Sequence, residues 1–69
     1  MSEIAKVIEL VASSKNGWED AVRTAVRDSS KTIRNITGVD VRDWTARVKE
    51  GEIVEYKVNV KIAFGVETT

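Results

Sequence analysis

The sequence predicts an α+β fold: a β-α-β-β subunit in which a three-stranded antiparallel sheet wraps around one helix. Two observations lead to this fold class. Apolar residues recur at three- and four-residue spacing after Gly17, which is the period of an amphipathic helix. On both sides of that segment, β-branched stretches are bounded by polar or glycine-containing turns, which is typical of strands. The chain has 69 residues, so we expect one domain spanning residues 1–69.

The first strand is predicted over residues 4–12. This segment is rich in Ile and Val, and the polar run 13–17 that follows it has the composition of a turn. Alternate residues of a strand point to opposite faces, and apolar residues occupy both sets here. Both faces of this strand are therefore candidates for burial.

The helix is predicted to begin at Trp18 and to continue for about twenty residues. Asn16 and Glu19 have the spacing of a capping box, with Asn16 as the N-cap. Gly38 lies where a helix of this length would stop. The apolar stripe consists of Trp18, Val22, Ala25, Ser29, Ile33 and Ile36.

The second strand is predicted over residues 39–49. Its apolar residues change phase near residues 42–43, which indicates a β-bulge or burial of both faces. Gly51 is free to take positive φ and is expected to form a tight turn with Glu50. The last strand has the most regular alternation, so we place it in the centre of the sheet. The predicted core is Val22, Ala25, Ile33, Ile36, Tyr56, Val58, Val60 and Ile62.

Composition argues against several classes of function. The chain has no Cys and no His, which removes thiolate metal sites, Cys nucleophiles and the commonest general base. It has 11 basic and 11 acidic residues, whereas a general nucleic-acid binder needs a positive excess. No apolar run is long enough to cross a membrane, and residues 1–3 lack the basic start of a signal peptide. We therefore expect a cytoplasmic protein that is no enzyme and binds neither nucleic acid nor membrane.

Size and open strand edges favour self-association. A domain near this length buries only about 60% of the surface that its unfolded chain exposes. Such domains usually add disulfides, metals or oligomerisation, and without Cys or His the last of these is the route that remains. One helix cannot cover so long a sheet, so one face and both edges are expected to stay open to partners.

Few residues indicate chemistry by themselves. We interpret the acidic side chains near the hairpin as a solvated surface or as ion pairs between subunits, because nothing in the sequence implies a cleft. Trp44 lies at the phase switch, where it either fills a core or interface gap or presents its ring to a ligand. Lys57 is most simply a solvated or ion-paired lysine. The acidic side chains in question are Asp40, Asp43, Glu50 and Glu52.

The chain as a whole resembles the dodecins, over residues 3–67. The resemblance rests on a collinear set of segments: KVIELV (6–11), WEDA (18–21), KTIRNI (31–36), VDV (39–41), EYKV (55–58) and VKIAF (60–64). It implies a subunit whose sheet wraps one helix, and a hollow homo-dodecamer of four trimers with cubic 23 symmetry. Many dodecins bind flavins such as riboflavin, FMN or FAD, two per pocket, and store or quench them without catalysis.

The chain departs from the family pattern at the ligand site that this resemblance implies. Flavin-binding dodecins open the second strand with Trp-x-Glu-Val, and Gly38 stands where this stacking Trp is expected. Lys57 stands where a Gln hydrogen-bonds the isoalloxazine, and Thr45 where some bacterial members have an Arg. The candidate flavin pocket is therefore Gly38, Thr45 and Lys57, with Trp44 as a candidate replacement ring.

These departures predict weak flavin binding. Loss of an indole removes stacking and apolar contact worth on the order of several kcal/mol, which moves a nanomolar site to micromolar or weaker. We expect a dodecin-like assembly that has no catalytic role, with ions on its symmetry axes as a further candidate cargo. The alternative is a storage dodecin that still binds riboflavin or FMN in a non-standard pocket, through Trp44 or Lys57.

Overall fold

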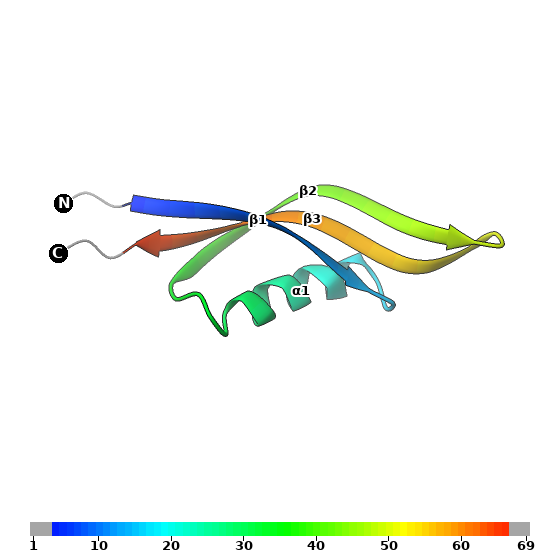
Figure 1. Cartoon of the computed structure of the whole chain (residues 1–69), viewed down its shortest axis with the longest axis horizontal. Coiled ribbons are helices and arrows are strands. Elements are labelled where there is room, and N and C mark those ends of the chain that lie inside the picture. The colour runs from blue at the N-terminus through cyan, green and yellow to red at the C-terminus, as the bar shows by residue number, and fades with distance from the viewer. Residues whose placement is uncertain (1–3, 67–69) are drawn as a thin grey trace.

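The computed structural model describes residues 4–66 of the chain. The elements are the strand β1 (Ile4–Ser14), the helix α1 (Trp18–Ser29) and the strands β2 (Ile36–Lys49) and β3 (Glu52–Val66). The strands form one antiparallel sheet in the order β1-β3-β2, and α1 lies along one face of it (Figure 1). This arrangement confirms the predicted β-α-β-β fold and the central place of the last strand. The ends of the expected domain, residues 1–3 and 67–69, lie outside the described residues.

The pairing register divides the sheet into two faces. Residues directly opposite each other on adjacent strands project to the same side, so the alternation along β3 extends across the sheet. We call the side that α1 covers the helix face and the other side the open face. The helix face of β3 carries Tyr56, Val58, Val60, Ile62 and Phe64. The open face of β3 carries Glu55, Lys57, Asn59, Lys61 and Ala63.

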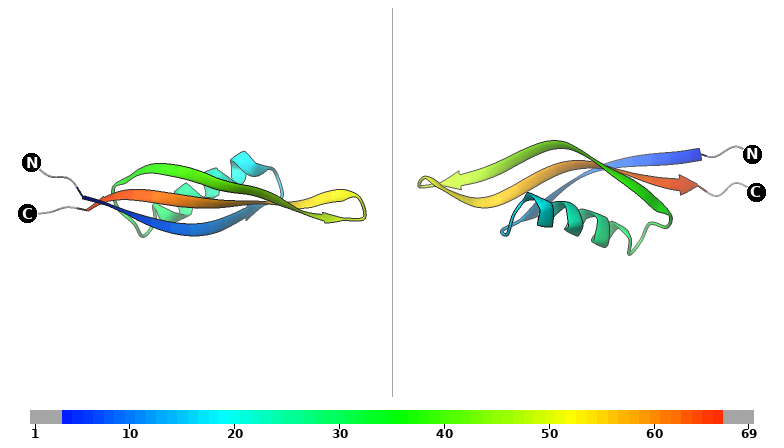
Figure 2. Two further views of the ribbon diagram at one scale, coloured as in Figure 1. Left: turned by 90° about the horizontal axis from the view of Figure 1, so that it is seen from above. Right: turned by 180° about the vertical axis from the view of Figure 1, so that it is seen from behind.

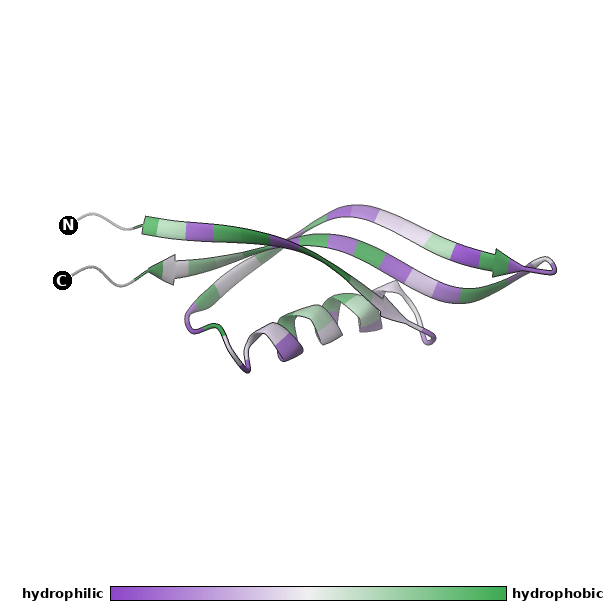
Figure 3. Ribbon diagram, in the orientation of Figure 1, coloured by the Kyte–Doolittle hydropathy of each residue, from purple (hydrophilic) through white to green (hydrophobic). Residues whose placement is uncertain are grey.

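A small buried core joins α1 to the middle of β3. It consists of Ala21, Ala25, Val58, Val60 and Ile62, none of which is more than 4% exposed. The alanines let the helix backbone approach the sheet, and the branched residues fill the pleated surface beneath it. The alternation of apolar and polar residues that placed these three β3 residues in the core is visible along the strand (Figure 3).

The predicted core needs two corrections. Ile33 does not belong to the core cluster, because it lies beyond the end of α1. Ala21 was not predicted and is fully buried. Val22 and Ile36 are half-buried and pack against the core, while half-buried Tyr56 packs on Trp18 instead.

The helix begins at Trp18 as predicted, but without a capping box. Its N-cap is Gly17, at φ 151°, and no side chain caps the first turn. Asn16 donates its backbone N–H to Ser14 Oγ at 2.9 Å, and that hydroxyl donates to Asp20 Oδ2 at 2.6 Å. The serine at the end of β1 therefore connects the strand to the first turn of α1.

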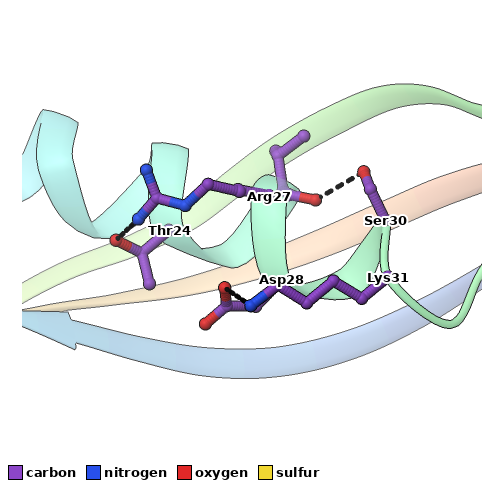
Figure 4. Close-up of polar contacts among 6 residues, drawn as sticks. Thr24, Arg27, Asp28, Ser30 and Lys31 are labelled. Atoms are coloured by element: carbon purple, nitrogen blue, oxygen red, sulfur yellow. Dashed lines mark hydrogen bonds and ion pairs between the residues drawn. The ribbon is translucent and has the colours of Figure 1, made fainter.

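The helix ends at Ser29, earlier than predicted. Ser30 Oγ donates to the carbonyl of Val26 at 2.7 Å, and the same carbonyl accepts the Ser30 backbone N–H at 3.0 Å (Figure 4). Lys31 forms an ion pair with Asp28 at 3.3 Å in the same turn. The serines therefore mark the C-terminus of the helix, although the apolar spacing continues past them.

Asn35, rather than Gly38, supplies the left-handed residue after the helix. Asn35 adopts φ 63°, a conformation that Asn tolerates better than most residues. Its carbonyl accepts a hydrogen bond from the Gly65 N–H at 2.9 Å, which fixes the return of the chain to the sheet. Gly38 lies inside β2, which begins at Ile36 and not at Val39.

The predicted bulge in β2 is confirmed. The pairing with β3 shifts between Val41 and Asp43, and two further shifts lie nearer the strand ends. The hairpin turn is also where it was expected. Glu50 (φ 53°) and Gly51 (φ 79°) both take positive φ, as a two-residue type I′ turn requires.

The described chain is elongated and leaves much of its sheet uncovered. Its radius of gyration is 14.4 Å, whereas a compact domain of this length has about 11 Å. The β2–β3 hairpin extends well past α1 (Figure 2). Large apolar side chains stay exposed at Ile4, Val7, Val11, Val39, Trp44, Val48 and Ile53.

Candidate functional site

The structure separates the four residues of the candidate flavin pocket. Gly38 is paired with Ala63, and Thr45 is paired with Lys57, which places all of them on the open face. Trp44 is paired with a core residue and lies on the helix face. The sheet therefore stands between Trp44 and the other three residues.

Cross-strand pairing arranges the open face in rows of three residues, one from each strand. The rows are Val7, Ala63 and Gly38; Glu9, Lys61 and Asp40; Val11, Asn59 and Asp43; and Ser13, Lys57 and Thr45. The first row is small and apolar. The second places a lysine between two carboxylates, and the third and fourth are mostly polar. The face thus changes from an apolar end at Gly38 to a polar end at Lys57.

Nothing in the backbone requires a glycine at position 38. Gly38 does not have a positive φ, and a Cβ added there would meet no heavy atom within 4 Å. A shallow hollow of about 260 Å³ lies beside it, bordered by Val7, Val39, Lys61 and Ala63 among others. A large side chain at position 38 would therefore fit without backbone strain.

At the polar end of the face, position 57 offers hydrogen-bond donors only. Lys57 Nζ lies 4.0 Å from Glu55 Oε1, and Arg47 Nε approaches the same oxygen at 3.6 Å. An ammonium donates hydrogen bonds but accepts none. Lys57 can therefore meet a ligand carbonyl, whereas the amide that the resemblance places there would also meet a ring N–H.

Gly38 and Lys57 are too far apart to hold one ring system within a single chain. Ala63, opposite Gly38, is six residues (63 − 57) from Lys57 along β3. At about 3.3 Å per residue this separation is roughly 20 Å. A pocket that uses both positions must therefore combine two chains.

Trp44 belongs to an aromatic cluster that sequence reasoning missed. Its ring centroid lies 6.2 Å from that of Trp18, with the planes at 72°. Tyr56 lies 4.8 Å from Trp18 at 76°, and Trp18 Nε1 donates to the Thr45 carbonyl at 2.8 Å. We call Trp18, Trp44 and Tyr56 the aromatic shelf. The three residues come from three elements, so only the register beyond the bulge in β2 brings them together.

Asn59 carries an unsatisfied acceptor on the open face. Its Oδ1 atom is buried and has no hydrogen-bond partner among the described residues. Leaving such an atom unpaired costs roughly 1–3 kcal/mol. A donor from outside the chain would therefore stabilise this row. The alternation of the sequence marked Asn59 only as polar and gave no signal of this kind.

The acidic residues do not form a metal centre within residues 4–66. No three or more of them in that range are placed to hold one ion. Asp40 instead pairs with Arg42 at 3.1 Å in an exposed position. The same part of the chain also contains no helix that is long and apolar enough to cross a membrane. Ion binding on symmetry axes stays a prediction.

Comparison with known proteins identifies the relatives of this chain. The dodecin family model matches residues 4–67. A dodecin from Thermus thermophilus is 30% identical over 69 residues, which is 100% of both chains. Among solved structures, an arginine-to-alanine mutant of T. thermophilus dodecin has a TM-score of 0.92 at 29% identity, covering 99% of this chain and 100% of that chain. The dodecin of Streptomyces coelicolor has a TM-score of 0.90 at 28% identity, covering 97% and 96%.

Proposed function

Because the chain belongs to the dodecin family, we propose that it assembles into a hollow homo-dodecamer that binds flavin weakly or not at all. The assembly is non-catalytic, is built from single domains spanning residues 1–69, and serves storage or sequestration in the cytoplasm. Four trimers related by 23 symmetry make up the shell, as the resemblance implies.

Gly38 is the observation that carries the flavin part of this proposal. It occupies the position at which the resemblance expects the stacking Trp, and it presents no π surface. The open space around its Cβ position gives no structural reason for a glycine there. The replacement therefore removes a ligand contact without serving the fold.

The polar end of the open face supports the same conclusion. Thr45 and Lys57 are paired and take the places of the expected Arg and Gln. Lys57 also lies near Glu55, so part of its charge is balanced within the chain. With an ammonium in place of an amide, the ring N–H of a flavin has no acceptor at position 57.

The elongated shape supports the assembly part of the proposal. The described chain leaves seven large apolar side chains exposed, and one buried acceptor, Asn59 Oδ1, lacks a donor. Its radius of gyration of 14.4 Å exceeds that of a compact domain of this length, about 11 Å. Neighbouring subunits would cover the apolar surface and supply the donor.

Two measurements test this function. Light scattering at micromolar protein concentration should give a mass near twelve times 7.7 kDa, and a monomer or dimer would rule the assembly out. Titration with riboflavin and FMN, followed by flavin fluorescence quenching, should give dissociation constants that are micromolar or weaker. Nanomolar binding would overturn our interpretation of Gly38 and Lys57.

The alternative function is a flavin-storage dodecin with a non-standard pocket. The hollow beside Gly38 favours it, because Val7 and Ala63 provide apolar walls there. Two such hollows facing each other across a subunit contact would enclose a ring without a tryptophan. A yellow preparation, with nanomolar binding that is lost in Val7→Lys, would favour this function.

A further inference from the structure

We propose that a second copy of this chain covers the aromatic shelf, with Trp44 as the anchor of the contact. The inference rests on the proposed self-assembly and names one surface through which it occurs. The shelf lies on the helix face, away from Gly38, Thr45 and Lys57. It is therefore separate from the candidate flavin pocket.

Contacts within the chain orient the rings of the shelf. Trp18 is held by the hydrogen bond from its Nε1 to the Thr45 carbonyl and by the edge contact of Tyr56. The ring of Trp44 lies at a steep angle to that of Trp18, yet the residue remains 54% exposed. Rings held in place before binding lose little conformational freedom when a partner covers them, which favours their use as interface anchors.

The surroundings of the shelf resemble the centre and rim of a protein interface. A hollow of about 480 Å³ adjoins Trp18 and Trp44, where α1 begins. Glu19, Asp20 and Arg23 line the same hollow, and the exposed Glu19–Arg23 ion pair has a 3.6 Å separation. An apolar centre with a charged, solvated rim is the usual composition of a stable protein contact.

A second copy is the partner that fits these observations. The exposed surface of the chain is 5331 Å². A compact monomer of this mass exposes roughly 4,300 Å², so the excess is about 1,000 Å². That excess is similar to the roughly 800 Å² that each partner buries in a standard interface. The net charge is zero, so copies do not repel one another through net charge. Other copies of the chain are also present wherever the chain is made, so this partner is always available.

Tryptophan fluorescence tests the proposal directly, because the chain has only two tryptophans. In Trp18→Phe, Trp44 is the sole reporter; this variant loses the Nε1 hydrogen bond to Thr45 but keeps an aromatic ring at position 18, and light scattering checks that it keeps the native mass. In the assembled protein we expect blue-shifted emission and at least fivefold lower acrylamide quenching than in the urea-unfolded chain. Emission should shift to the red as dilution lowers the mass measured by light scattering.

A matched pair of charge insertions on β2 tests whether Trp44 is the anchor. Trp44→Lys should weaken assembly. The protein concentration at which the mass reaches half of its full value should rise at least tenfold. Trp44→Phe should keep the native mass. Thr37→Lys places the same charge at another exposed position of the strand and should also leave the mass unchanged. If Trp44→Lys fails to fold, the fluorescence of Trp18→Phe still decides the question.

The outcomes separate this inference from the proposed function. Full-size assembly with Trp44 as accessible as in the unfolded chain overturns the inference and leaves the proposed function in place. Protection of Trp44 only after riboflavin is added would mean that a small molecule covers the shelf, and this also overturns it. A native chain that is monomeric at micromolar concentration removes the proposed assembly, and the inference with it.

Discussion

Ile62 and Ile53 are the same residue type on the same strand, yet one is fully buried and the other is 45% exposed. Ile62 belongs to the core cluster with Ala21 and Ala25 of α1. Ile53 instead follows Glu52 at the start of β3, next to the hairpin turn, and the β2–β3 hairpin extends past α1 (Figure 1). The difference shows how much of its apolar surface a single chain can bury by itself. A helix of 12 residues covers the centre of a 15-residue strand and leaves the hairpin for another molecule.

The largest expected effect tests this comparison directly. Ile62→Ala should lower the free energy of unfolding by about 2–4 kcal/mol, because it leaves a cavity in the core. Chemical denaturation at one fixed protein concentration measures this loss. Ile53→Ala makes the same chemical change and should cost less than about 1 kcal/mol.

Two results would contradict this account of the two isoleucines. An equal loss for both substitutions at unchanged mass would mean that the hairpin is covered within its own chain. A large loss for Ile53→Ala together with a fall in mass would identify the hairpin as a contact between subunits. Light scattering alongside denaturation separates the two cases.

The second prediction restores the expected flavin contacts on the open face. Gly38→Trp combined with Lys57→Gln should strengthen riboflavin binding at least tenfold, about 1.4 kcal/mol. The Trp adds a stacking surface and the Gln adds an acceptor. Fluorescence quenching measures the change, and Gly38→Trp alone should give part of it. Unchanged affinity in the double variant would show that these positions do not reach a ligand.

The third prediction compares two glycines that differ in backbone geometry. Gly51→Ala should destabilise the protein by about 1 kcal/mol, because Gly51 takes φ 79° in the hairpin turn. Gly38→Ala should stay within about 0.5 kcal/mol, since position 38 has no positive φ and open space around it. Thermal unfolding of both variants is the measurement. A loss at position 38 as large as at position 51 would contradict the structural account of Gly38.

The smallest expected effect concerns the exposed ion pair at the start of α1. Arg23→Ala removes the 3.6 Å contact with Glu19 and should change the free energy of unfolding by less than about 0.5 kcal/mol. The difference should shrink further in high salt, because both side chains are exposed and screened. A larger, salt-resistant effect would indicate that a neighbouring subunit buries this pair.

The sequence alone determined the elements whose patterns are local. The period of two along β3 predicted its central place and three of the five core residues, because alternation directly reports which side chains share a face. Glu50 and Gly51 marked the hairpin for a similar reason, since the turn geometry depends on few residues. The sequence also carried the family resemblance and the departures at Gly38, Thr45 and Lys57.

The end of the helix was predicted incorrectly because two local signals competed. Ile33 and Ile36 continue the apolar spacing of α1, which favoured a longer helix. The helix ends at Ser29, where the Ser30 hydroxyl bonds back to the Val26 carbonyl, and Asn35 then takes a left-handed conformation before β2. Hydrogen bonds of this kind depend on where the chain must go next, and the periodicity of apolar residues does not contain that information.

The face that each candidate site residue of β2 occupies depends on strand pairing, whereas the alternation along β3 already placed Lys57 on the polar face. Trp44 and Thr45 are neighbours in sequence, and the bulge in β2 determines which of them joins the helix face. A shift of one residue in register reverses the side of every residue that follows. The pairing also placed Gly38 and Lys57 roughly 20 Å apart and brought Trp18, Trp44 and Tyr56 together. These distances depend on hydrogen bonds between strands that are distant in sequence, so the order of residues alone did not reveal them.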